Sequence, residues 1–164
     1  MKNSDFLSKL IAEKNLEIVE CSEEMSHSYE KKSAECREVA KLAFNNNYFE
    51  SAVTQSYYSM YNAVLSLFFK CGIKCENHSG TLILLKNFFS QNELYLILSK
   101  SKVERIDKQY YTSEAQTNPL TKESANEIII SMMAFNPKLI SFKNSLSLKE
   151  IEKIRSLIKE IGVK

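Results

Sequence analysis

Cysteine and histidine are the side chains best suited to bind a soft metal ion, and the chain contains four cysteines and two histidines. Cys71 and Cys75 are separated by three residues and lie close to His78. Structural zinc sites need four ligands, usually in two closely spaced pairs, and no second Cys/His pair stands at such a spacing. The sequence therefore favours cysteines that pack as small apolar side chains, and we expect no bound zinc and no cofactor.

A second group of chemically capable residues lies about 20 residues before His78. Tyr57 and Tyr61 are four residues apart and so share one face of a helix, while Tyr58 and Asn62 share an adjacent face. In one interpretation Tyr57 packs in the core and the Tyr58 hydroxyl satisfies a buried partner. In the other, Tyr58, Tyr61 and Asn62 form the polar wall of a cleft that binds a nucleotide or a phosphate.

His78 is expected at the N-terminus of a helix, where the helix dipole disfavours the cationic form of the imidazole. It has two interpretations. As a structural residue it would hydrogen-bond and fix the loop after the central helix. As a functional residue it would transfer protons or bind a base, provided that a cation such as Arg105 lies near it.

The composition indicates how these residues are positioned. Glycine and proline, which interrupt regular structure, number only 3 and 2 in 164 residues, while apolar residues make up 44% of the chain. The net charge of +2 limits any nucleic-acid contact to a local patch. The sequence has neither a secretion signal nor an apolar run long enough to span a membrane, so we expect a cytoplasmic protein.

Apolar residues recur at intervals of three and four residues along most of the chain, which predicts seven helices and no strand. The predicted caps are Asn47 with Glu50, Thr121, and Ser147 with Glu150, and Gly72 is the predicted stop of the central helix. A polar loop is expected over Tyr111–Leu120, and Asn136-Pro137 should kink or end the sixth helix. The predicted helices are Asp5–Met25, Tyr29–Asn45, Tyr48–Lys70, one from Asn77-His78, Asn92–Lys108, one from Thr121, and one from Ser147.

The predicted fold is all-α, an antiparallel up-and-down helical bundle around Tyr48–Lys70. Cys36, Val39 and Ala40 are expected to belong to the buried stripe of the second helix, and Cys21 to the apolar face of the first. All 164 residues form one domain, in which residues 138–164 are a C-terminal helical appendage. This appendage is expected to dock either on the bundle or on another subunit.

Three motifs in order resemble the HEPN family (higher eukaryotes and prokaryotes nucleotide-binding) over about residues 33–133. Gln55–Val64 is similar to the hallmark Arg-Ala-Tyr-Tyr-Ala-Met-(Tyr/Phe)-(His/Asn)-Ala-Ala helix of small prokaryotic members. Cys71-Gly72-Ile73 with Asn77–Gly80 is similar to Lys-Gly-(Ile/Leu) followed by Thr-His-x-Gly. Arg105–Tyr110 corresponds to Arg-x-x-Ala-Asp-Tyr.

The resemblance implies a helical bundle, commonly a homodimer and often encoded beside a minimal nucleotidyltransferase. Many relatives belong to toxin–antitoxin or defence systems and cut RNA with Arg followed, four to six residues later, by His. In this chain no arginine is followed by histidine at that spacing; after Arg105 stand Gln109, Tyr110 and Tyr111. A tyrosine, with a pKa near ~10, is a poor general base at neutral pH.

Three functions stay open. The leading hypothesis is a HEPN protein that binds a nucleotide, RNA or a nucleotidyltransferase partner through a cleft near Tyr58, His78, Arg105 and Tyr110, with Tyr61 and Asn62 beside it. The second is a metal-independent endoribonuclease in which His78 and Arg105 are the catalytic residues. The third is a non-catalytic bundle that binds other proteins. Surplus apolar residues on the central and C-terminal helices also predict a homodimer.

Overall fold

The computed structural model describes the backbone of residues 2–110 and 120–162 and the side chains of residues 4–104 and 120–162. In chain order the elements are α1 (Lys2–Ala12), β1 (Leu16–Ile18), α2 (Glu23–Asn45), α3 (Phe49–Lys70), β2 (Ile73–Cys75), α4 (His78–Asn87), α5 (Asn92–Tyr110), α6 (Lys122–Ser145) and α7 (Leu148–Gly162).

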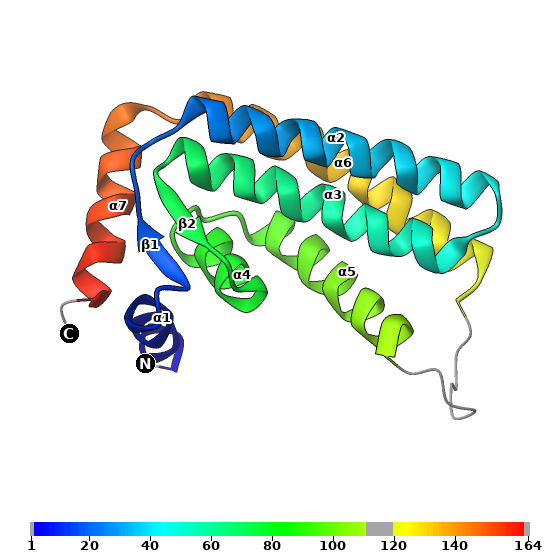
Figure 1. The fold of residues 1–164 in the computed structure, drawn as a ribbon, viewed down its shortest axis with the longest axis horizontal. Helices are drawn as coiled ribbons and strands as arrows, with labels where there is room; N and C mark the ends of the chain where they lie inside the picture. The colour runs from blue at the N-terminus through cyan, green and yellow to red at the C-terminus, as the bar shows by residue number, and fades with distance from the viewer. Residues whose placement is uncertain (1, 111–119, 163–164) are drawn as a thin grey trace.

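The prediction of an all-α bundle around the central helix is confirmed. The long helices α2, α3, α5 and α6 alternate in direction along the chain and lie side by side (Figure 1). Helix α3 packs against α2, α5 and α6 and also contacts β2. Its buried residues lie all around its circumference, which explains why it carries more apolar residues than any other helix. No helix within the described residues is long and apolar enough to cross a lipid bilayer.

Small residues allow α2 and α3 to approach closely. Ala52, Ser56, Ser59, Ala63 and Ser66 are all buried in α3 and alternate at intervals of four and three residues. On α2 the fully buried positions are seven residues apart and equally small: Ser26, Ser33 and Ala40. This α2–α3 seam has the periodicity of antiparallel helices packed along one stripe.

Polar bonds fix the register of the seam. The Ser33 hydroxyl donates to the Ser59 carbonyl at 2.7 Å, and the Ser59 hydroxyl donates back to the Ser33 carbonyl at 2.8 Å. Two turns away, the Ser26 and Ser66 hydroxyls lie 3.2 Å apart. A one-residue slip would leave these buried groups without partners, so the pairing specifies a single register.

Helix α6 contributes one buried polar side chain to each of these serine pairs. The Asn136 side-chain amide donates to the Ser59 hydroxyl at 2.8 Å. The Lys143 ammonium donates to Ser66 at 2.9 Å, to Ser26 at 3.1 Å and to the Glu30 carboxylate at 2.7 Å. The three helices are thus connected by two buried polar layers.

The structure contains two short strands that the sequence analysis did not predict. Strand β1 pairs antiparallel with β2, with Leu16 opposite Cys75 and Ile18 opposite Ile73 (Figure 1). The predicted helix over Asp5–Met25 is therefore wrong, because α1 ends at Ala12. Leu16 and Ile18 fit a helical stripe and a strand alternation equally well, and pairing with the segment after α3 decides in favour of the strand.

Helix α1 ends where Lys14 adopts a left-handed conformation, with φ of 58°. The Asn15 amide then donates to the Leu10 carbonyl and the Lys14 amide to the Ile11 carbonyl, which is the Schellman pattern. Helix α2 begins six residues before its predicted start at Tyr29, because the Ser22 hydroxyl accepts from the Met25 amide as an N-cap.

The predicted capping box of Asn47 with Glu50 is also wrong. Asn47 has a φ of 63° and forms the turn, while Tyr48 is the N-cap of α3 without a side-chain hydrogen bond. Asparagine suits both a turn and an N-cap, because it adopts the left-handed backbone conformation and its side chain also caps helices. The buried stripe of α2 is wrong in part: Ala40 is buried, but Val39 is 46% exposed. Cys21 precedes α2 and is exposed.

Three other predicted helix ends, at Thr121, Ser147 and Gly72, are confirmed. Thr121 and Ser124 form a capping box for α6, and Ser147 and Glu150 form one for α7. Gly72 ends α3 with a φ of 64°. Pro137 does not end α6, which continues to Ser145.

The C-terminal appendage docks on its own chain. Helix α7 buries Ile151, Ile154 and Ile158 and packs against α1 and β1. One nitrogen of the Arg155 guanidinium donates to the carbonyls of Val19, Gly72 and Cys71 at 2.8, 2.9 and 3.0 Å. A Cβ at Gly72 would lie 1.8 Å from this nitrogen, so Gly72 is required for the close approach as well as for the left-handed backbone.

Replacing Lys143 with alanine should lower the free energy of unfolding by about 2–4 kcal/mol, because Glu30 and two buried serines lose their shared donor. Urea denaturation measures this change. The matched control is Lys138→Ala on the same helix, whose exposed ion pair with Glu93 should contribute under ~1 kcal/mol. Equal losses for the two variants would contradict the structural role of Lys143.

Replacing Arg155 with alanine should release α7 more than the rest of the chain, because three carbonyls lose their donor. Hydrogen exchange should accelerate for residues 148–162 and 16–19, while the amides of α3 stay protected. Lys153→Ala, an exposed position on the same helix, provides the control. Uniform acceleration throughout the bundle would show that Arg155 does not act locally.

Candidate functional site

His78 is held by the central helix. It is the first residue of α4, where the Asn77 side chain caps the helix by accepting from the Ser79 and Gly80 amides. The Tyr57 hydroxyl lies 2.7 Å from His78 Nδ1. Because Tyr57 is only 1% exposed and fixed in the core, the imidazole is fixed with it.

Tyr61 supplies the second contact with the imidazole. Its ring centroid lies 4.3 Å from that of His78, with an angle of 32° between the ring planes. The Tyr61 and Tyr57 centroids lie 5.9 Å apart, with an angle of 16° between the planes. Burial raises the pKa of Tyr61 to about 12, so its hydroxyl stays protonated at neutral pH. Tyr57, Tyr61 and His78 form what we call the aromatic cluster, of which His78 alone is half-buried rather than buried.

A cation from α5 reaches the same end of α4. The Lys102 ammonium donates to the Ser79 hydroxyl at 2.8 Å, and both side chains are half-buried. Lys102 therefore binds the residue that directly follows His78 in the chain. Lys102 was not among the predicted site residues, although it lies three residues before Arg105 and so on the same face of the helix.

Of the other predicted site residues, the structure describes the side chains of Tyr58 and Asn62. Tyr58 is half-buried, and its ring packs against that of Tyr57 in an edge-on arrangement with the centroids 5.6 Å apart. Asn62 donates to the Cys36 thiol of α2 at 3.7 Å and is not part of the aromatic cluster. Arg105 and Tyr110 belong to α5, but their side chains lie outside the described residues, as does most of the predicted loop.

The cysteines near His78 are buried within the fold. The Cys75 thiol donates to the Asn77 carbonyl at 3.5 Å, and burial raises its pKa. Burial likewise raises the pKa of Cys71 to about 12. Among the side chains that the structure describes, no group of three or more potential ligands could hold a metal ion. The expectation of no bound zinc stays a prediction that metal analysis of the purified protein can test.

The chemistry available at this end of α4 combines an oriented imidazole, a hydroxyl and an ammonium. An imidazole can transfer a proton, and an ammonium with a hydroxyl can bind a phosphate oxygen. The Tyr61 hydroxyl, which stays protonated, does not act as a base, and Tyr57 and Tyr61 fix the orientation of the imidazole.

A model of the HEPN domain matches residues 26–135, about two thirds of the chain, and the protein belongs to the HEPN family. The match begins within α2 and ends within α6, so it includes the seam, the aromatic cluster and α5. Helix α1, strand β1 and helix α7 lie outside it. A comparison with curated proteins gives no significant match.

Replacing Tyr57 with phenylalanine should change the tautomer of His78. A phenol is a better donor than acceptor towards an imidazole nitrogen, so we expect Nδ1 to accept and Nε2 to carry the proton. Nitrogen-15 NMR should show one dominant tautomer in the wild type above the pKa of His78, and a mixture in Tyr57→Phe. Tyr48→Phe, at an exposed position, should leave the tautomer unchanged. A mixture in the wild type would contradict the expected orienting role of Tyr57.

Proposed function

We propose that the protein binds RNA, and that the surface formed by His78, Ser79 and Lys102 holds a phosphate with the adjoining nucleotide. The observation that supports this proposal is the 2.8 Å bond from Lys102 to Ser79, beside an imidazole oriented by Tyr57 and Tyr61. A phosphate oxygen requires a cation and hydroxyl or amide donors, and a base requires an aromatic or imidazole surface next to them.

The low net charge is consistent with a small footprint. With a formal charge of +2, the chain lacks the uniformly basic surface of proteins that bind nucleic acid by bulk electrostatics. Recognition would therefore rest on a few well-placed groups. Arg105 adds to them in this proposal, because the family motif selects it and helical spacing puts its position on the Lys102 face of α5.

In the wider context, we propose a component of a two-part toxin–antitoxin or defence system, with a nucleotidyltransferase as the partner. The basis is family membership rather than geometry.

A homodimer also stays a prediction. The apolar faces of α3 and α7, on which the sequence-based prediction rested, are largely buried within the chain. The exposed large apolar side chains lie instead mostly on α2, α5 and α6, and include Leu42, Leu96, Val103 and Ile130.

The second candidate function is a metal-independent endoribonuclease. The bond from Tyr57 to Nδ1 favours it, because a single tautomer is what a general acid or base requires. No arginine precedes a histidine at the spacing usual for the family's nucleases, so His78 would act with Lys102 or Arg105. Incubation of the protein with labelled RNA in EDTA tests this function, and loss of cleavage in His78→Ala would support it.

Binding is tested by fluorescence anisotropy with a labelled single-stranded RNA of mixed sequence. We expect Lys102→Ala to weaken binding by about tenfold or more, since a hydrogen bond to a charged group contributes about 1.5–3 kcal/mol. Arg105→Ala should have a similar effect. Lys100→Ala is the matched control, because it removes the same charge from an exposed position two residues away.

Three outcomes of this experiment lead to different interpretations. Weaker binding in Lys102→Ala but not in Lys100→Ala, with unchanged thermal stability, supports the proposed site. Equal loss in both variants would indicate unspecific electrostatic attraction. No binding of RNA or nucleotides at micromolar protein would favour a bundle that binds only other proteins.

A further inference from the structure

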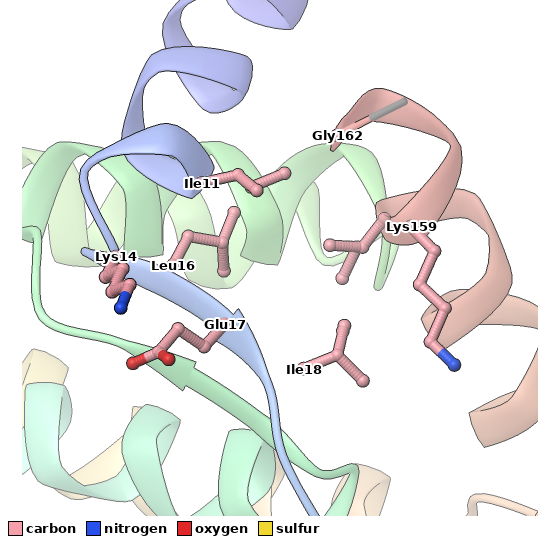
Figure 2. Close-up of a pocket in the computed structure, with 8 residues that line it drawn as sticks. Ile11, Lys14, Leu16, Glu17, Ile18, Lys159 and Gly162 are labelled. Carbon is pink, nitrogen blue, oxygen red and sulfur yellow. The ribbon is translucent and has the colours of Figure 1, made fainter. Parts of the chain in front are cut away.

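A cavity of about 510 Å³ lies between α1, β1 and α7, on the part of the chain outside the HEPN match. Figure 2 shows its walls converging from these three elements. Gly162 closes one side, because α7 approaches α1 so closely there that a Cβ would lie 3.2 Å from Ile11 Cγ2. The cavity therefore belongs to an accessory layer of the fold and is separate from the aromatic cluster.

The interior of the cavity is apolar. It is lined by Ile11, Leu16, Ile18 and Ile158, which come from all three elements. Leu16 and Ile158 are almost completely buried, while Ile11 and Ile18 are half-buried and border the open space (Figure 2). Cavities of about 300–1,000 Å³ with such a lining have the size and character of small-molecule sites.

The rim of the cavity is cationic. Lys14 and Lys159 are both exposed, and they lie on opposite sides of it in Figure 2. Neither forms an ion pair with another residue that the structure describes. Glu17 is the one acidic residue in the described lining, and its carboxylate pairs with Lys74 at 3.3 Å. Lys74 is shared with Glu76 at 3.1 Å, but the lining holds two lysines and one carboxylate, so its net charge is positive.

We propose that this cavity binds a small amphipathic anion, an aliphatic or aromatic chain that ends in a carboxylate. Burial of a chain against four branched side chains provides the favourable free energy, and a lysine at the rim neutralises the end group. A nucleotide does not fit this lining, because a ribose and several phosphates need convergent polar donors that an isoleucine-rich cavity lacks.

The chain supplies two variants that remove the rim charge with little effect on the fold. Lys14 has a φ of 58°, which glycine adopts without strain, so Lys14→Gly removes the ammonium and keeps the backbone. Lys159→Ala removes the other ammonium from an exposed helical position. Lys149→Ala is the matched control, since it takes the same charge from α7 outside the cavity.

The test is titration calorimetry of the full chain with decanoate and with decanol, two probes of equal chain length that differ in charge. Decanoate should bind more tightly than decanol. Lys14→Gly and Lys159→Ala together should weaken decanoate binding by about fivefold, the effect of an exposed ion pair of ~1 kcal/mol, and leave decanol binding unchanged. Ile18→Glu should weaken both probes and decanoate most, because it adds a carboxylate beside the apolar interior.

Three results would overturn the proposal. The first is no heat of binding for decanoate at millimolar concentration, and the second is equal affinity for the acid and the alcohol with no effect of the lysine variants. The third is a dimer in sedimentation that dissociates in Ile18→Glu, which would mean that a second copy covers the cavity. Circular dichroism and the thermal midpoint of each variant confirm that the fold is retained.

Discussion

The close approach of α2 and α3 is the constraint on which the rest of the structure depends. Ser33 and Ser59 each donate to the other's carbonyl, which is feasible only when two helices almost touch. The residue numbers of Ser26 with Ser66 and of Ser33 with Ser59 have the same sum, as antiparallel pairing requires. Continuation of this register would set Ala40 opposite Ala52, and both are fully buried. Helix α6 then joins the pair through Asn136 and Lys143.

This constraint also fixes the candidate site. Small residues of α3 line its contact with α2, while Tyr57 and Tyr61 lie on another face of α3 and contact His78 of α4. The short strand β2 and the Asn77 cap then bring His78 back over the tyrosines instead of letting the chain continue past them. A rigid core residue therefore determines the orientation of a half-buried imidazole, which is how a fold gives a surface group a fixed direction.

Local signals were enough to predict the helices and most of their ends, because caps such as Thr121 and Ser147 act through backbone groups a few residues away. The strands could not be predicted, since β1 exists only because residues 73–75 lie beside it. The buried hydrogen bonds of Lys143 could not be predicted either, because its partners lie 77 to 117 residues away in the sequence. At the site, the sequence predicted that His78 and Tyr61 border a cleft, but it predicted neither the bond from Tyr57 to His78 nor the bond from Lys102 to Ser79. These contacts depend on how α4 and α5 cross α3.

Arg155 connects three segments that are far apart in the chain: the residue after β1, the turn that ends α3, and α7 itself. Because α7 is synthesised after everything it holds, its docking is a late event in the order of synthesis. Until then the carbonyls of Val19, Cys71 and Gly72 lack this donor. The guanidinium can therefore form these hydrogen bonds only after the segments that it connects have folded. Because α7 docks beside α1 and β1, the first and the last helix of the described chain lie together at one end of the bundle (Figure 1).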